Sequence, residues 1–143
     1  MDKNYFQEIC DKYEFITALY VTDNDGVVLV NIITSIRDHI GGTNEEFEKK
    51  MSSLKTSLAF IYISQIEQIA RIEKWKTQYI TTIYDSLAVF QTKLNKNLIC
   101  HFICDTDKFN SSILKDVCID LKNKFKILEK EIDLLNSNTE INI

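Results

Sequence analysis

Two of the four cysteines in this sequence flank a histidine, and these residue types can bind zinc or pair as a nucleophile and its base. Cys100, His101 and Cys104 fall in a stretch typical of a β-strand. On a strand the two cysteines share a face but lie about 13 Å apart, and His101 points to the opposite face. This spacing excludes one zinc ion bound by both thiolates and separates Cys100 from His101. We therefore interpret the cysteines as core residues, since Cys is among the most buried residue types.

A short acidic run at 23–26, with the sequence DNDG, resembles part of a calcium-binding loop. An EF-hand would place one ligand two residues before this run and a bidentate glutamate six residues after it. Those positions hold Val21 and Ile32, which are apolar residues of the flanking β-branched segments. An Asp-Gly pair between two such segments favours a hairpin turn, because Gly accepts a positive φ at little cost. We therefore interpret the run as a turn.

The remaining polar candidates do not converge on a catalytic site. His39 stands beside Asp38 in a predicted loop, and the glycine pair at 41–42 lacks the further glycines and the lysine of a phosphate-binding loop. The acidic residues of 45–48 begin a predicted helix, where the helix dipole alone favours carboxylates. We predict no catalytic, cofactor-binding or metal-binding residues, no cofactor, and a protein that is not an enzyme.

The hydrophobic pattern predicts an alternation of helices and strands. Spacings of three and four residues indicate helices, and β-branched runs indicate strands. A capping box, Thr43 with Glu46, marks the start of the central helix. In chain order the expected elements are a helix at 2–13, strands at 16–21 and 27–32, a helix at 43–69, strands at 79–84, 87–91 and 98–104, and a helix at 108–135.

Short polar links between the strands require antiparallel pairing. The simplest packing is an α+β fold, a five-stranded antiparallel sheet with helices on both faces. We expect a single domain over residues 1–135 and a flexible polar tail over residues 136–143.

The central helix is apolar on two sides, so both sides should be covered. One seam is expected to pack on the sheet: Phe47, Met51, Leu54, Leu58 and Ile61. A second set should face away from the sheet and form an exposed patch: Ala59, Tyr62, Ile63 and Ile66. The strand at 79–84 is expected to be a sheet edge with unpaired amides.

Composition excludes several classes of function. A net charge of −4 and a pI of about 5.2 do not attract phosphate backbones, so no nucleic-acid partner is expected. The polar start is not a secretory signal, position 2 is not the glycine of a myristoylation site, and no apolar run is long enough to span a bilayer. We expect membrane association only indirectly, through partners. The scattered cysteines favour a reducing compartment, hence the cytosol.

The hairpin and the later strands resemble a known family. Residues 21–27, VTDNDGV, resemble the V-S-D-x-D-G-V hairpin of the Ragulator MAPK-scaffold (MEK-binding partner) subunits, a family of the roadblock/dynein light chain superfamily. Residues 87–91, LAVFQ, and 98–103, LICHFI, are similar to the family's V-V-Q-F and L-V-V-S-F-I strands. The chain departs from the family in lacking prolines at 34–42, in lacking a glycine at 65–76, and in a longer C-terminal helix and tail.

The resemblance implies a non-enzymatic scaffold that forms a heterodimer with a second roadblock subunit. The central helix and the strand at 79–84 of each chain would pair into one continuous sheet. We therefore expect these partner-interface residues: Ala59, Tyr62, Ile63, Ile66, Tyr79, Thr81 and Ile83.

The resemblance further implies a Ragulator-like complex on the cytosolic face of late endosomes or lysosomes. A lipidated anchor subunit would hold the complex there, where it would recruit Rag GTPases and the TOR kinase complex, with a link to MAPK signalling.

Two alternatives stay open. One is a dynein light chain of the roadblock type or a homodimeric regulator of a small GTPase. The other, from a different class, is a small-ligand sensor domain with a pocket between sheet and helix. A sensor would need polar groups converging inside the fold, and the sequence shows none.

Overall fold

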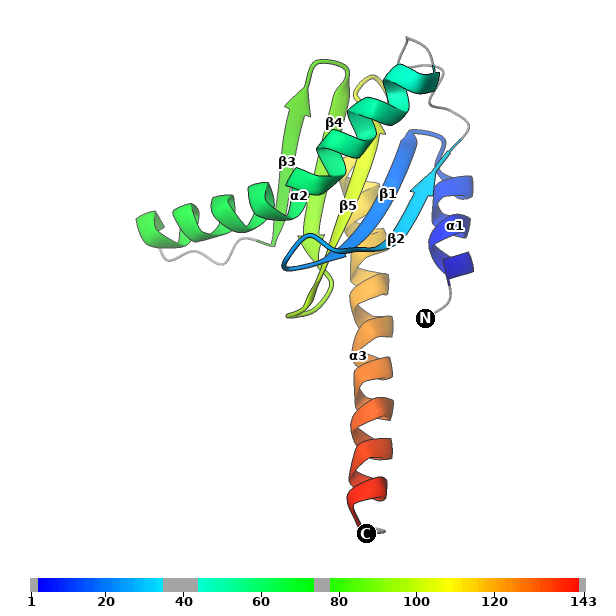
Figure 1. Ribbon diagram of the computed structural model, residues 1–143, viewed down its shortest axis with the longest axis vertical. Coiled ribbons are helices and arrows are strands. Elements are labelled where there is room, and N and C mark those ends of the chain that lie inside the picture. The colour runs from blue at the N-terminus through cyan, green and yellow to red at the C-terminus, as the bar shows by residue number, and fades with distance from the viewer. Residues whose placement is uncertain (1–2, 35–43, 74–77, 142–143) are drawn as a thin grey trace.

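The fold has the predicted order of helix, two strands, helix, three strands and helix. Figure 1 presents it as a computed structural model that describes residues 3–34, 44–73 and 78–141. The elements are α1 (Lys3–Lys12), β1 (Ile16–Asp23), β2 (Val28–Ile33), α2 (Asn44–Glu73), β3 (Tyr79–Tyr84), β4 (Leu87–Lys93), β5 (Leu98–Asp105) and α3 (Ser111–Ile141). The proposed cap Thr43 and the loop residues His39 and 41–42 lie outside the described residues.

All five strands form one antiparallel sheet in the order β2-β1-β5-β4-β3. The N-terminal hairpin therefore joins the three-stranded meander through the pairing of β1 with β5. This order leaves β2 and β3 at the two edges, which confirms the predicted position of the strand at 79–84.

The acidic run at 23–26 forms the turn of the first hairpin, as predicted. Gly26 has a φ of 89°, a conformation that is cheap only for glycine. The Asp23 carboxylate accepts hydrogen bonds from the backbone amides of Asp25 and Val27, each at 2.9 Å. The Asp23 side chain therefore holds the turn itself, a role that explains this aspartate without a metal ion.

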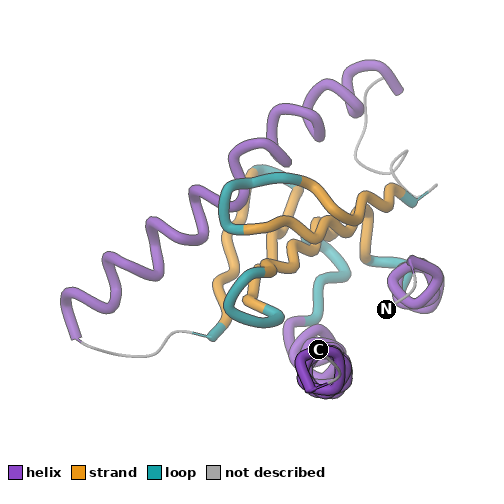
Figure 2. Tube along the Cα trace, turned by 60° about the horizontal axis from the view of Figure 1, so that its bottom comes forward, coloured by secondary structure: helices purple, strands orange, loops and turns teal. Residues whose placement is uncertain are grey.

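Helices cover both faces of the sheet, as expected (Figure 2). One face packs against α1 and α3 around a large apolar core that includes Phe6, Phe90, Phe102, Leu114 and Leu121. The other face packs against α2 through two smaller clusters. The four cysteines are buried and unpaired, which agrees with the core interpretation.

The C-terminal helix is longer than predicted. The expected end was residue 135, followed by a tail, but the backbone of 136–141 continues α3 to Ile141. In Figure 1 this helix runs well past the end of the sheet. Within the described residues, none of the helices combines the length and the apolar character that a bilayer span requires.

Candidate partner-binding surface

The face that α2 turns to the sheet differs from the predicted seam. Ala59 and Tyr62 were expected to face outward, but both are buried against the sheet in a cluster with Ile80 and Ile99. The Tyr62 hydroxyl accepts a hydrogen bond from the Lys93 amide at 3.2 Å. The reason is helical geometry. An apolar stripe on a helix can continue from Leu58 either to Ile61, three residues on, or to Tyr62, four residues on, and in the structure it continues to Tyr62.

Met51, Leu54 and Leu58 do lie on the sheet side, as predicted. Ile61 is half-buried, and the side chain of Phe47 lies outside the described part of the chain. The correct stripe is Met51, Leu54, Leu58 and Tyr62, and its next members, Ile66 and Ile69, are half-buried.

The C-terminal part of α2 overhangs the edge of the sheet. In Figures 1 and 2 this part of the helix runs past β3, the outermost strand on that side. Ile63 and Ile66 stand where the helix leaves the sheet and are half-buried, while Ile72 near its end is 76% exposed. A helix that extends its apolar stripe beyond its own sheet leaves that stripe to be covered by something else.

The edge strand β3 carries exposed apolar side chains of its own. Ile83 is 58% exposed, and Tyr84 and Thr81 are also exposed. Tyr79 is half-buried and contacts Phe90, with ring centroids 5.5 Å apart. The overhang of α2 and the free edge of β3 lie on the same side of the molecule, so they form one candidate surface.

The register of β3 with β4 determines which amides face the free edge. Tyr84 pairs with Leu87 across the two-residue turn Asp85-Ser86. In a two-residue hairpin the residues that flank the turn exchange both backbone hydrogen bonds, and this pattern then alternates along the ladder. The amides of Tyr84, Thr82 and Ile80 therefore point to β4. Those of Tyr79, Thr81 and Ile83 point away from the sheet.

Two exposed residues of this surface were not among the predicted interface residues: Ile72 and Tyr84. Ile72 was missed because the helix was expected to end at residue 69 and instead ends at Glu73.

His101 is part of a buried polar chain rather than a catalytic pair. Its Nε2 lies 2.8 Å from Thr22 Oγ1 and its Nδ1 lies 2.9 Å from Gln91 Nε2. Gln91 also donates to the carbonyl of Leu58 at 2.9 Å, which ties the sheet to α2. Burial lowers the pKa of His101 to about 3, so the ring is neutral near pH 7 and accepts from Gln91 through Nδ1. The role of this chain is structural, since it satisfies polar groups beneath α2.

The thiols are equally unsuited to catalysis. Burial raises the pKa of Cys10 and of Cys118 to about 12 and raises that of Cys104 and Cys100 as well. With such raised pKa values the thiols stay protonated near pH 7, and a protonated thiol is a poor nucleophile because the thiolate is the reactive form. Among the described residues there is also no group of three or more His, Cys, Asp or Glu side chains placed to hold a metal ion.

Lowering the pH from about 7 to about 5 should lower the free energy of unfolding by about 2 kcal/mol through His101. Its pKa is about 3 in the folded chain and 6.5 when unperturbed. Between these values the unfolded chain binds a proton that the folded chain does not, so stability falls as pH drops below 6.5. Urea denaturation at both pH values measures this slope, and His101→Gln should flatten it. If the free energy of unfolding falls equally with pH in the wild type and in His101→Gln, the lowered pKa of His101 is contradicted.

Comparisons with known proteins agree with this architecture. A search of curated protein sequences finds no match to the chain. Among solved structures, the Roadblock/LC7 domain from Streptomyces avermitilis superposes with a TM-score of 0.65 at 10% identity, covering 87% of this chain and 93% of that one. MglB of Myxococcus xanthus superposes with a TM-score of 0.56 at 13% identity, covering 80% of this chain and 85% of that one. MglC from Myxococcus xanthus superposes with a TM-score of 0.56 at 8% identity, covering 82% of this chain and 93% of that one.

Identities this low establish a shared fold, the roadblock fold, and no more. The profile of one protein family matches the sequence directly, over residues 2–116, which is most of the chain. The match spans α1, the whole sheet, α2 and the first turns of α3. The chain therefore belongs to the family described as mitogen-activated protein kinase kinase 1 interacting, and its domain is a roadblock domain.

Proposed function

We propose that this protein is a non-enzymatic scaffold subunit that pairs with a second roadblock chain through α2 and β3. The observation that carries the proposal is the free edge of β3 beside the overhanging end of α2. A partner with the same fold would add its own β3 to this edge and place its sheet beneath the overhang. One contact would then cover both exposed features.

The exposed residues support this mode of pairing. Ile72 on α2 and Ile83 on β3 present apolar surface that a soluble monomer would leave in water. The outward amides of Tyr79, Thr81 and Ile83 supply the hydrogen bonds that strand addition needs. The interface we propose comprises Ile63, Ile66, Ile72, Tyr79, Thr81 and Ile83, with Ala59 and Tyr62 supporting it from beneath α2.

The wider role that we propose is that of a subunit in a Ragulator-like complex. Such a complex would recruit Rag GTPases and TOR kinase signalling to the cytosolic face of late endosomes or lysosomes through a lipidated anchor subunit. The support is the resemblance of the hairpin and the meander strands to the Ragulator MAPK-scaffold family. The family's description, which names an interaction with a mitogen-activated protein kinase kinase, supports a further MAPK scaffold role.

Affinity purification of the tagged chain with mass spectrometry tests the partner. We expect a second roadblock-domain protein at equal abundance, together with a lipidated subunit and Rag GTPases. Size-exclusion chromatography with light scattering tests the pairing itself. We expect a stable complex that contains one copy of this chain and one copy of the roadblock partner. A chain that stays monomeric and retains no roadblock partner would overturn the proposal.

A further inference from the structure

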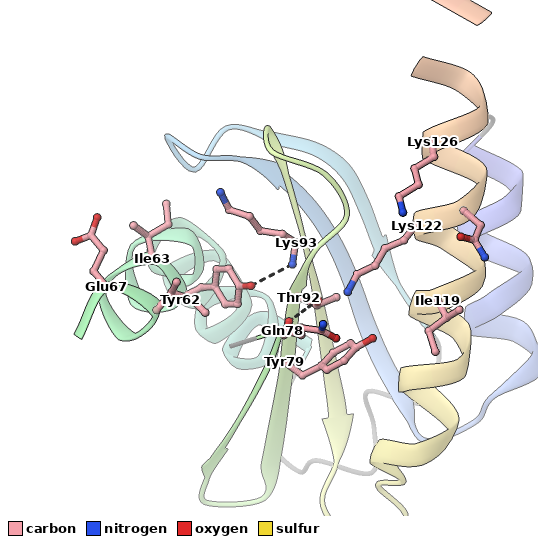
Figure 3. Close-up of a pocket in the computed structure, with 12 residues that line it drawn as sticks. Tyr62, Ile63, Glu67, Gln78, Tyr79, Thr92, Lys93, Ile119, Lys122 and Lys126 are labelled. Atoms are coloured by element: carbon pink, nitrogen blue, oxygen red, sulfur yellow. Dashed lines mark hydrogen bonds between the residues drawn. The ribbon is translucent and has the colours of Figure 1, made fainter. Parts of the chain in front are cut away.

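A groove of about 620 Å³ opens between α2, the start of β3, the end of β4 and α3 (Figure 3). Its volume falls in the range of about 300–1,000 Å³ that is usual for binding sites. Segments far apart in the sequence build it: Ile63 and Glu67 come from α2, Lys93 from β4, and Lys122 and Lys126 from α3. It adjoins the proposed partner surface and shares Ile63, Ile66 and Tyr79 with it, but its basic side chains come from β4 and α3.

The charge of the groove is opposite to that of the chain. Lys93, Lys122 and Lys126 line it, and Glu67 is the one acidic residue of its lining among the side chains that the structure describes, whereas the whole chain carries a net charge of −4. In the part of the chain that the structure describes, the ion pair present is Lys124–Asp120, and it lies outside this groove. The three groove lysines therefore lack a carboxylate partner among the described residues.

Lys122 is the most constrained of the three. Its Nζ lies 4.4 Å from the centre of the Tyr79 ring, which holds the ammonium at the groove wall. Burial lowers the pKa of Lys122, and the charge of Lys126 one helical turn away acts in the same direction. Like charges four residues apart on a helix destabilise it. An acidic group bound between these two lysines would relieve that repulsion.

The rest of the lining is apolar with a few amides. Ile63 and Ile66 of α2 and Ile119 of α3 supply apolar side chains, and Gln78 and Asn123 add amide groups. Such a lining suits a ligand that brings apolar side chains as well as negative charge. A bare inorganic anion would leave the apolar part unused.

We propose that this groove binds an acidic segment of a partner protein, with carboxylates against Lys122, Lys126 and Lys93 and an apolar side chain between α2 and α3. The positive lining identifies the sign of the ligand charge, since the described side chains leave its lysines without a carboxylate partner. The concave shape favours a peptide segment over a membrane, since a flat lipid surface does not reach lysines on the walls of a groove. Three lysines on an acidic domain are too few for a nucleic-acid footprint.

Fluorescence anisotropy with the full chain tests the proposal. The probe is a labelled ten-residue peptide of alternating glutamate and leucine, with an alternating glutamine and leucine peptide beside it. We expect the glutamate peptide to bind and the glutamine peptide to bind more weakly. The double variant Lys122→Glu with Lys126→Glu should weaken binding about tenfold or more. Raising salt to about 1 M, where the Debye length is about 3 Å, should weaken binding by the wild-type chain.

Lys108→Glu is the matched control, because it makes the same charge change at an exposed lysine outside the groove. It should leave peptide binding unchanged. Should the double reversal fail to fold, Lys122→Gln with Lys126→Gln replaces it and should also weaken binding.

Two results would overturn the groove proposal: equal peptide binding by wild type and the folded double variant, or no binding of the glutamate peptide at all. Binding to vesicles with about 30% anionic lipid that requires these lysines would also overturn it, in favour of a membrane surface. Pairing with a roadblock chain is measured separately on the same variants. Both lysines belong to α3, and of the two Lys122 contacts Tyr79 at the border of the pairing surface. Loss of peptide binding with pairing intact therefore separates the two proposals.

Discussion

Ile63→Asp should give a chain that folds but no longer pairs with a roadblock partner. Ile63 is half-buried where α2 leaves the sheet, so its own fold tolerates a polar side chain there at modest cost. In the proposed complex a partner covers this position, so an aspartate would lose its hydration, and the lysines of the adjoining groove would offset only part of that cost. The penalty should be on the order of 3 kcal/mol, or about a hundredfold in Kd.

Light scattering after size-exclusion chromatography, on the variant mixed with its partner, measures this loss. Thermal unfolding followed by circular dichroism checks that the fold survives. Leu29→Asp is the control: Leu29 is an exposed apolar residue on β2, at the opposite edge of the sheet, so the same change should not affect pairing. Normal pairing of Ile63→Asp, or an equal loss with Leu29→Asp, would refute the proposed interface.

The order of elements was predictable because local signals determine it. The Asp-Gly turn at 25–26 and the two-residue link at 85–86 force antiparallel neighbours, and β3 is left at an edge because the hairpin joins the meander at β5. The strand interpretation of Cys100 and Cys104 agrees with the structure, where both are buried residues of β5. These inferences needed only distances along the chain.

The orientation of α2 was not predictable to the same degree. Leu58 is followed by apolar residues at both the third and the fourth position, so periodicity alone allows two stripes. The structure selects the stripe through Tyr62, because this side chain fills space beside Ile80 and Ile99 and its hydroxyl binds the Lys93 amide. That choice depends on strands that follow α2 in the sequence, which a local pattern does not contain.

The basic groove was invisible in the sequence for a similar reason. Its lysines are spread over β4 and α3 among acidic residues, and only the packing of α3 beside β4 gathers them. The extent of α3 was missed because polar residues after Leu135 were interpreted as a tail. Nothing in 136–141 is a proline or a glycine, so no residue there forces the helix to end.

Thr81→Pro should abolish pairing while leaving the single chain folded. The ladder register points the Thr81 amide to the free edge, so proline removes a donor that β4 does not use. A partner strand added at this edge would lose that hydrogen bond, and the proline ring would stand in its path. An unsatisfied carbonyl on the partner alone costs on the order of 1–3 kcal/mol.

Thr82→Pro is the matched control, one residue further along the same strand. Its amide points to β4, so proline there should break a ladder hydrogen bond and lower the free energy of unfolding on the order of 1–3 kcal/mol. The expected pattern is therefore a contrast. Thr81→Pro should unfold at the wild-type temperature and fail to pair, whereas Thr82→Pro should unfold at a lower temperature. If Thr81→Pro pairs as tightly as the wild type, the partner does not add a strand to β3, and the free edge has some other role.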